Sequence, residues 1–307
     1  MDLYNNKNLF YIRLLTIFVP RLLHAPFAIC ASGIFYLLLS EKRRALRRNL
    51  IVVTGRTQVE WLVFLTFYKF ARNWCDIMLM MGLRGPRLLA LIGRQCSEKP
   101  LDDAIAAGKG AILLSIHLGN WELGGLGLAE KGYRMNILTF REPDAKVNLK
   151  REQLRRERGI NFIYVDREVT TSLAIVEAVQ ALNRNEVLAI LGDRDGSSHT
   201  MALEFFGRQV RLPLGPAYLA LASGAPVIPV FVPLEGERYA AIMEQPIFFQ
   251  ASRDERDRVI REGTEQLVRI FERYIRAYPD QWYNFFDYFA GGASRRTIQA
   301  KKGVADD

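Results

Sequence analysis

The sequence predicts an α/β fold with a mostly parallel central sheet and helices on both of its faces. Beyond Pro100, short apolar runs alternate with amphipathic segments, which is the pattern of successive βαβ units. Right-handed crossovers between parallel strands place the intervening helices on both faces of the sheet. Half of the 307 residues are hydrophobic, so the chain can fill a substantial core. Before Pro100 the pattern changes to long apolar helices, which we expect to anchor the chain to a membrane.

The N-terminal anchor is predicted from residues 22–39, in which His24 is the only potentially charged side chain. Crossing a bilayer takes about 20 apolar residues, so this run is borderline. It could span the membrane or lie on it, and a buried helical hairpin is the alternative. Residues 1–50 carry eight Lys or Arg against two acidic residues, most of the net charge of +9. Basic residues beside apolar runs indicate an anionic membrane surface rather than nucleic acid as the partner.

The remaining chain divides into a catalytic domain and a short tail. Residues 59–81 form a second predicted helix, with aromatic side chains at helical spacing. We therefore expect an anchor at 1–50, an α/β domain at 51–290 and a flexible tail at 291–307. Three widely spaced cysteines show no metal-binding pattern, and no metal or cofactor is expected. The predicted strands are 111–116, 135–139, 162–165, 187–191 and 227–232, and the predicted helices are 120–130, 145–158, 171–184, 216–223 and 254–278.

His117 is the first candidate for chemistry, because it ends the apolar strand 111–116. Parallel α/β sheets bind ligands at the carboxyl ends of their strands. Glu122 follows in the first turn of the next helix, where its carboxylate can reach one imidazole nitrogen. Such a contact fixes the tautomer and leaves the other nitrogen as a base near neutral pH. A purely structural histidine is the alternative.

The group on which this base would act is predicted to be a hydroxyl of the substrate. Ser115 lies two residues before His117 and shares its face of the strand, so a Ser–His nucleophile pair is an alternative. The sequence contains no Gly-x-Ser-x-Gly elbow, which disfavours an α/β-hydrolase.

A second polar cluster, Asp193-Arg194-Asp195, follows the predicted strand 187–191. Two carboxylates and a guanidinium at a strand end could bind phosphate, hold a metal or close a turn. Since this strand end and His117 lie at the same edge of the sheet, we expect the cluster to belong to the site.

The segment His-Leu-Gly-Asn-Trp-Glu at 117–122 resembles the histidine–four residues–acidic motif of the glycerolipid acyltransferase superfamily. Its Asn-Trp-Glu ending is similar to that of the bacterial lipid A biosynthesis (lauroyl/myristoyl) acyltransferases. The resemblance extends over about residues 10–290 in the family's order and spacing. The other matching segments are Phe140-Arg141, 193–195 with Phe-Phe-Gly at 205–207, 213–216, 224–229, and Pro-Asp-Gln-Trp at 279–282.

This resemblance implies a membrane-bound O-acyltransferase with a glycerolipid acyltransferase-like fold. The acyl chain would come from an acyl thioester of acyl carrier protein or coenzyme A and pass to a hydroxyl of a lipid A precursor or related glycolipid. The implied location is the bacterial inner membrane, with the catalytic domain on the cytoplasmic face. The implied general base is His117, with Glu122 as its catalytic partner, and the implied substrate-binding residues are Asn120, Arg141, Asp193, Arg194 and Asp195.

One departure from the family pattern leaves the acceptor open. Tyr-Asn-Phe-Phe-Asp at 283–287 stands where lipid A enzymes usually carry a Trp-Phe-His-Arg type ending. A lysophospholipid or another glycolipid is therefore an alternative acceptor. Two hypotheses from other classes are a non-catalytic, membrane-associated lipid-binding protein and a metal-dependent hydrolase that uses His117, Glu122, Asp193 and Asp195. The basic helix at 145–158 is either a solvated face or a docking surface for acidic acyl carrier protein.

Overall fold

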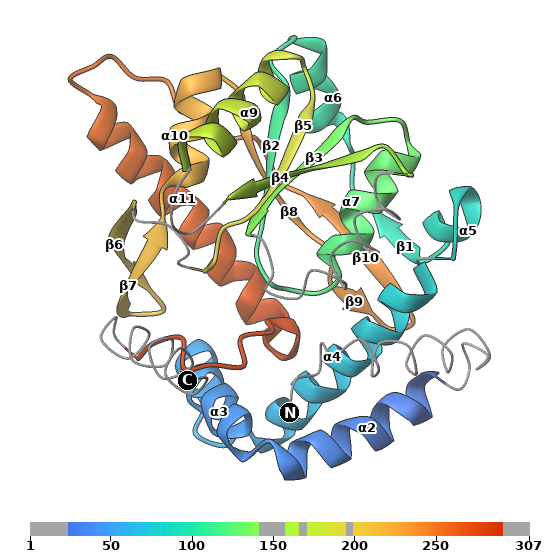
Figure 1. Cartoon of the computed structure of the whole chain (residues 1–307). Coiled ribbons are helices and arrows are strands. Elements are labelled where there is room, and N and C mark those ends of the chain that lie inside the picture. Colours follow the sequence, from blue (N-terminus) through green and yellow to red (C-terminus); the bar gives the residue numbers. More distant parts are fainter. Residues whose placement is uncertain (1–23, 81, 141–156, 166–170, 195–198, 291–307) are drawn as a thin grey trace, which may run out of the picture.

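The computed structural model describes residues 24–80, 82–140, 157–165, 171–194 and 199–290 (Figure 1). Three predicted features fall wholly or mostly outside these ranges. They are the basic helix at 145–158, the substrate-binding candidates Arg141 and Asp195, and the tail at 291–307.

The central sheet is mostly parallel, as predicted. In the described part of the chain it has eight strands, with the order β1-β10-β8-β2-β5-β3-β4 and β9 paired to β10. All neighbours from β8 to β4 are parallel, whereas β10 runs antiparallel to β8. The strands are β1 Ile92–Gln95, β2 Ala111–Ser115, β3 Met135–Phe140, β4 Ile160–Val165, β5 Val187–Leu191, β8 Val227–Phe231, β9 Leu234–Glu235 and β10 Arg238–Met243.

Helices cover both faces of this sheet, and the central strand β2 is therefore buried on both sides. Ile112 and Leu114 join one hydrophobic cluster, while Ala111 and Leu113 join another. The first cluster includes α9 (Thr171–Asn183), α10 (Gly215–Ser223) and α11 (Arg256–Ala277). The second includes the end of α4 (Glu60–Met80), with α5 (Gly85–Leu89), α6 (Lys99–Ala106) and α7 (Trp121–Glu130).

The register between β2 and β5 positions the site. The strands pair in parallel from Ala111 opposite Val187 to Ser115 opposite Leu191. His117 follows Ser115 by two residues, and Asp193 follows Leu191 by two residues. Both side chains therefore leave the same edge of the sheet at matching positions.

The N-terminal helices form a separate layer below the sheet in Figure 1. They are α2 (His24–Leu38), α3 (Ser40–Thr54) and the first part of α4, which share a third hydrophobic cluster. Helix α3 runs through the predicted boundary at residue 50. Among the residues that the structure describes, no helix combines the length and apolarity needed to cross a bilayer.

Two further pieces complete the carboxyl edge of the sheet. A hairpin of β6 (Thr200–Phe205) and β7 (Arg208–Pro213) follows β5. After α11, the short helix η2 (Pro279–Gln281) begins a stretch that crosses the ends of β2 and β5. Residues 281–288 of this stretch are called the C-terminal strap below.

Candidate active site

A histidine–aspartate pair lies at the carboxyl edge of the sheet. The Nδ1 atom of His117 lies 2.6 Å from Oδ1 of Asp193. Since an ionised carboxylate only accepts hydrogen bonds, Nδ1 carries the proton and Nε2 is left with a free lone pair. The side chain of His117 is 17% exposed and that of Asp193 is fully buried. The pair therefore presents one basic nitrogen in a largely buried setting.

The electrostatics of the pair favour a neutral imidazole and an ionised carboxylate. Burial lowers the pKa of His117 below its ordinary value, although Asp193 opposes this shift. Burial alone would raise the pKa of Asp193, but His117, Arg194 and a hydrogen bond from Trp282 hold that pKa well below its usual range. His117 is therefore unprotonated at neutral pH, the state that a general base requires.

Glu122 was predicted to orient the imidazole, but the structure places Asp193 on Nδ1. The physical reason is the register of the parallel strands, which brings residue 193 opposite residue 117. Glu122 lies in the first turn of α7, and its part in catalysis stays a prediction. Asp193 was predicted to bind substrate, whereas its buried carboxylate contacts His117.

The second oxygen of Asp193 accepts hydrogen bonds from the C-terminal strap. Trp282 donates through Nε1 at 3.0 Å and Asn284 through Nδ2 at 3.3 Å. The Tyr288 hydroxyl donates to the main-chain carbonyl of Asp193 at 2.5 Å. None of these three side chains has a predicted role. They lie about 90 residues from Asp193, and only the resemblance at 279–282 and the departure at 283–287 draw attention to this region.

Arg194 is directed toward the same strap. Its Nε donates to Oδ1 of Asn284 at 2.9 Å, and one Nη donates to the carbonyl of Tyr283 at 2.7 Å. Its guanidinium also lies over the ring of Phe286. Arg194 thus ties the end of β5 to the strap, and a role in substrate binding stays a prediction.

Asn120 fixes the turn between β2 and α7. It is fully buried, its Oδ1 accepts the backbone N–H of Leu123, and its Nδ2 approaches the sulfur of Met80. Gly119 has a φ of +66°, and a Cβ there would lie 2.1 Å from the carbonyl oxygen of Val232. These contacts hold the loop after His117 in place. The predicted contact of Asn120 with substrate remains untested.

The alternatives that involve other side chains find less support in the geometry. Ser115 is buried and its hydroxyl is directed to the carbonyl of Ile116, and the hydrogen bond of His117 is with Asp193. Within the described residues, no three His, Cys, Asp or Glu side chains gather as a metal site. Asp195, the fourth ligand in the hydrolase hypothesis, lies outside those residues.

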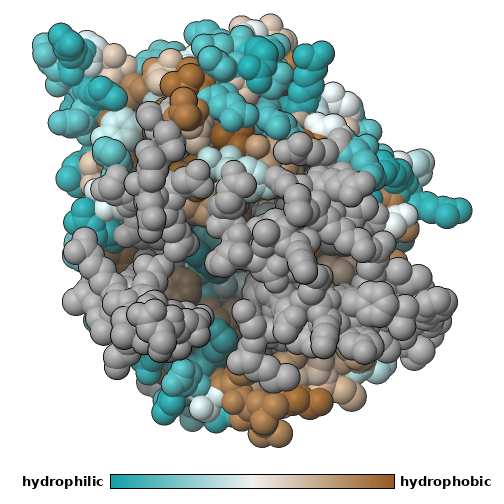
Figure 2. Space-filling view, in the orientation of Figure 1, coloured by the Kyte–Doolittle hydropathy of each residue, from teal (hydrophilic) through white to brown (hydrophobic). Residues whose placement is uncertain are grey.

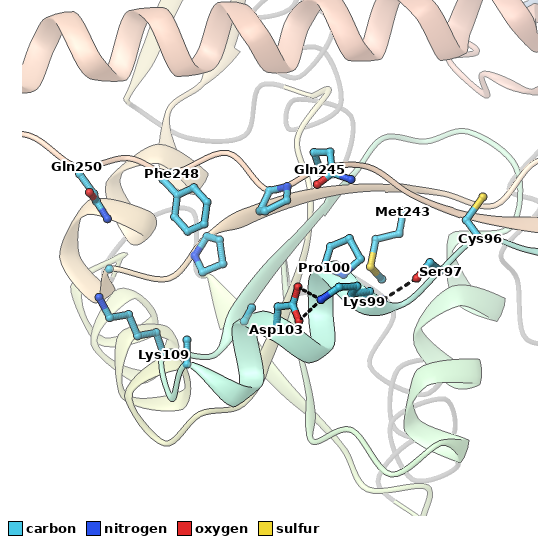
Figure 3. Close-up of a pocket in the computed structure, with 15 residues that line it drawn as sticks. Cys96, Ser97, Lys99, Pro100, Asp103, Lys109, Met243, Gln245, Phe248 and Gln250 are labelled. Carbon is cyan, nitrogen blue, oxygen red and sulfur yellow. Dashed lines mark hydrogen bonds and ion pairs between the residues drawn. The ribbon is translucent and has the colours of Figure 1, made fainter.

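A pocket of about 630 Å³ lies at the other edge of the sheet (Figure 3). Lys109 precedes β2 and Pro226 precedes β8, so this pocket opens at the amino ends of the strands. An ion pair between Lys99 and Asp103 lies on its wall. His117 is not among the lining residues, and the pocket is separate from the candidate active site.

Comparisons with known proteins show that the protein is an acyltransferase. The chain belongs to the bacterial lipid A biosynthesis acyltransferase family, whose model matches residues 8–289. It is similar to the phosphatidylinositol mannoside acyltransferase of Mycolicibacterium smegmatis, with 25% identity over 274 residues, which cover 86% of each chain. The Mycobacterium tuberculosis protein of the same description is 24% identical over 242 residues, covering 78% of this chain and 74% of the relative. The predicted family and enzyme class are confirmed.

Proposed function

We propose that this enzyme transfers a fatty acyl chain from an acyl thioester to a hydroxyl group of a membrane glycolipid, with His117 as the general base. The observation that carries the proposal is the pairing of His117 with Asp193, which leaves Nε2 unprotonated at the edge of the sheet. Family membership supplies the reaction class.

The reaction follows from this geometry in two proton transfers. Nε2 of His117 removes the proton from the acceptor hydroxyl as its oxygen attacks the thioester carbonyl. Asp193 stabilises the imidazolium that forms, because its carboxylate remains ionised. When the carbon–sulfur bond breaks, the imidazolium returns the proton to the departing thiolate. The products are an ester and a free thiol, and His117 is again neutral.

The acceptor that we propose is a glycolipid, either a lipid A precursor or a related molecule. The family takes its description from lipid A biosynthesis, and two similar proteins are described as phosphatidylinositol mannoside acyltransferases. The segment that departs from the lipid A pattern, 283–287, lies next to the base, because the N–H of Tyr283 donates to the carbonyl of His117 at 2.8 Å. Acceptor choice would therefore differ between this chain and other family members. A lysophospholipid is the alternative acceptor.

For the donor, we propose acyl carrier protein, with coenzyme A as the alternative carrier. Arg141 and Asp195, which follow β3 and β5 in the sequence, would bind substrate. Arg194 and Asn120 would contribute by holding the strap and the loop after His117 in place. Glu122 would act from the first turn of α7 on the same side of the sheet.

The lipid would approach from the layer of N-terminal helices, which we propose rests on the cytoplasmic face of the bacterial inner membrane. Figure 2 shows hydrophobic residues gathered at the lower edge, where α2 lies in Figure 1. Apolar side chains exposed there would enter the lipid interface, and the basic residues of α3 would meet anionic headgroups. The exposed apolar side chains are Phe27, Ile29, Ile34, Leu37, Leu38 and, on α4, Trp61.

A row of aromatic rings connects this layer with the base. The rings of His117 and Trp121 lie 5.2 Å apart, those of Trp121 and Tyr283 lie 6.4 Å apart, and those of Tyr283 and Phe70 lie 5.2 Å apart. Phe70 belongs to α4, which contacts α2. Phe70 and Trp121 are partly exposed whereas Tyr283 is buried, so an acyl chain would meet apolar surface at the first two rings.

The test is mass spectrometry of lipids after incubation with acyl-carrier-protein and coenzyme A donors and a panel of acceptors. The panel contains a lipid A precursor, a phosphatidylinositol mannoside and a lysophospholipid. We expect one acylated glycolipid, which is absent with His117→Ala. If no donor yields a product while the folded protein still binds lipid vesicles, the protein is a lipid-binding protein. If His117→Ala retains full activity, the base is another group.

A further inference from the structure

The C-terminal strap contacts both His117 and Asp193, the first through its main chain and the second through side chains. The carboxylate of Asp193 receives one hydrogen bond from Nδ1 of His117 on Oδ1 and two from the strap on Oδ2. Both strap donors, Trp282 and Asn284, are buried. Water therefore has little access to replace either of them.

Two donors on Oδ2 restrict the rotation of the carboxylate. Oδ1 stays directed at His117 only while the Cβ–Cγ bond of Asp193 is fixed, and the strap donors fix it from the other side. If they were lost, a buried carboxylate would lack partners for one oxygen, which costs free energy. The carboxylate would relieve that cost by turning, and the bond that defines the tautomer of His117 would weaken.

The backbone of the strap also holds the loop that carries the base. The N–H of Tyr283 donates to the carbonyl of His117, and the N–H of Gly119 donates to the carbonyl of Gln281. The side chain of Gln281 pairs with the main chain of Leu234, which places the start of the strap against β9. The same segment thus sets the position of both the imidazole and its carboxylate.

We infer that Trp282 and Asn284 are positioning residues, which keep His117 in its reactive tautomer by holding the carboxylate of Asp193. This inference rests on the proposed function, in which His117 is the general base. It deepens that function because it assigns two further residues, about 90 positions from Asp193 in the sequence, to the support of the proton transfer. Asn284 lies within 283–287, the segment that departs from the lipid A pattern. This segment would therefore position the base as well as influence the choice of acceptor.

Two variants separate hydrogen bonding from packing. Trp282→Phe keeps an aromatic ring next to Phe205 and Tyr288 but deletes the Nε1 donor. Asn284→Asp keeps the size of the side chain and an acceptor for Arg194, but it replaces the donor to Asp193 with a negative charge. The matched control is Tyr278→Phe, which deletes a hydrogen bond to Glu235 just before the strap.

The first measurement is the tautomer of His117 by ¹⁵N NMR, which does not depend on activity. The chain has only three histidines, so ¹⁵N-histidine labelling gives few signals, and His117→Ala assigns the one that matters. We expect the Nδ1–H tautomer in the wild type and in Tyr278→Phe, and a mixture of tautomers in Trp282→Phe and Asn284→Asp. An unchanged tautomer in both strap variants would overturn the inference.

The second measurement is steady-state kinetics of the same folded variants. A misplacement of about 1 Å costs about 100-fold in rate, so we expect kcat to fall about 10- to 100-fold with little change in KM. Asn284→Asp should also move the acid limb of the pH profile upward, because a second carboxylate near His117 raises the pKa of the imidazole. A normal kcat and pH profile in both variants would contradict the inference, even if His117→Ala is inactive. Activity retained by His117→Ala would instead contradict the proposed function.

Discussion

The proposed catalytic pair, His117 and Asp193, and the C-terminal strap are positioned by different physical means. His117 and Asp193 are positioned by main-chain register, because each follows by two residues the last paired residue of two adjacent parallel strands. Trp282 and Asn284 are positioned by side-chain hydrogen bonds after a helix of 22 residues, α11. The first arrangement is as rigid as the sheet itself. The second depends on a few buried polar contacts, so the two should respond differently to mutation.

The largest effect is expected at the base. His117→Ala removes the proposed general base, so kcat should fall by about 10⁴-fold, the upper end of the range for acid–base groups. The unfolding temperature should also fall, because the buried Oδ1 of Asp193 loses its hydrogen bond from His117, so circular dichroism must first show that the variant is folded. Purified protein and a defined donor–acceptor pair are enough for the measurement. A loss below about tenfold would contradict the assigned role.

The next effect is expected at the carboxylate. Asp193→Asn keeps the shape but removes the charge that stabilises the imidazolium, and its amide can turn a donor toward Nδ1. The imidazole would then carry its proton on Nε2, where it cannot act as a base. We expect kcat to fall about 10²- to 10⁴-fold. Because Asp193 is buried with four hydrogen bonds from other residues, circular dichroism must first show that the variant is folded.

A substitution of Glu122 shows which of the two carboxylates, Glu122 or Asp193, contributes more to catalysis. Since Asp193 occupies Nδ1, the change Glu122→Gln should cost less than Asp193→Asn, about tenfold in kcat and well below the usual range for an acid–base group. Both substitutions preserve size, so each serves as the control for the other. Equal losses would mean that Glu122 also contacts the reacting groups during turnover.

The pH dependence tests the burial of the base. Burial lowers the folded-state pKa of His117 below its ordinary value of 6.5, so the imidazole is neutral from below pH 6.5 upward. We expect kcat/KM to be flat across neutral pH and to fall about tenfold per unit only on the acid side of 6.5. An acid limb above pH 7 would show instead that the attraction of Asp193 outweighs burial.

The same contrast between register and side-chain contacts explains what the sequence alone could predict. Strands β2, β5 and β8 are short, continuous apolar runs, and their alternation with helices predicts a parallel sheet whose carboxyl edge carries His117. Strand β1 reads Ile-Gly-Arg-Gln and is mostly exposed, so it shows no apolar pattern. It forms because the main chain of β10 is available to pair with it, which composition does not reveal.

Within the site, the sequence predicts the residues more readily than their contacts. His117, Glu122 and the 193–195 cluster follow from position at strand ends. The choice of Asp193 over Glu122 at Nδ1 depends on the strand register, which becomes predictable only once β2 and β5 are known to be neighbours. No sequence periodicity predicts the contacts of Trp282 and Asn284, because their partner Asp193 lies after a strand end 89 and 91 residues earlier.

The smallest effect on rate, and a clear one on stability, is expected at the outer end of the strap. Asn49 of α3 is buried and donates to the carbonyls of Asn284 and Phe286, while its oxygen accepts the N–H of Tyr288. Asn49→Ala leaves three main-chain groups without these partners, two of them in buried contacts and one in a partly buried contact. Each buried unsatisfied group costs about 1–3 kcal/mol.

Chemical denaturation should therefore show a clear loss of unfolding free energy for Asn49→Ala, while kcat falls by less than in Trp282→Phe. Thr54→Val is the matched control, since it deletes a hydroxyl that donates within α3 to the carbonyl of Leu50. If Asn49→Ala lowers kcat as strongly as Trp282→Phe without loss of stability, the helix layer and the base are coupled more tightly than the strap contacts alone imply. The position of α3 would then control the proton transfer directly.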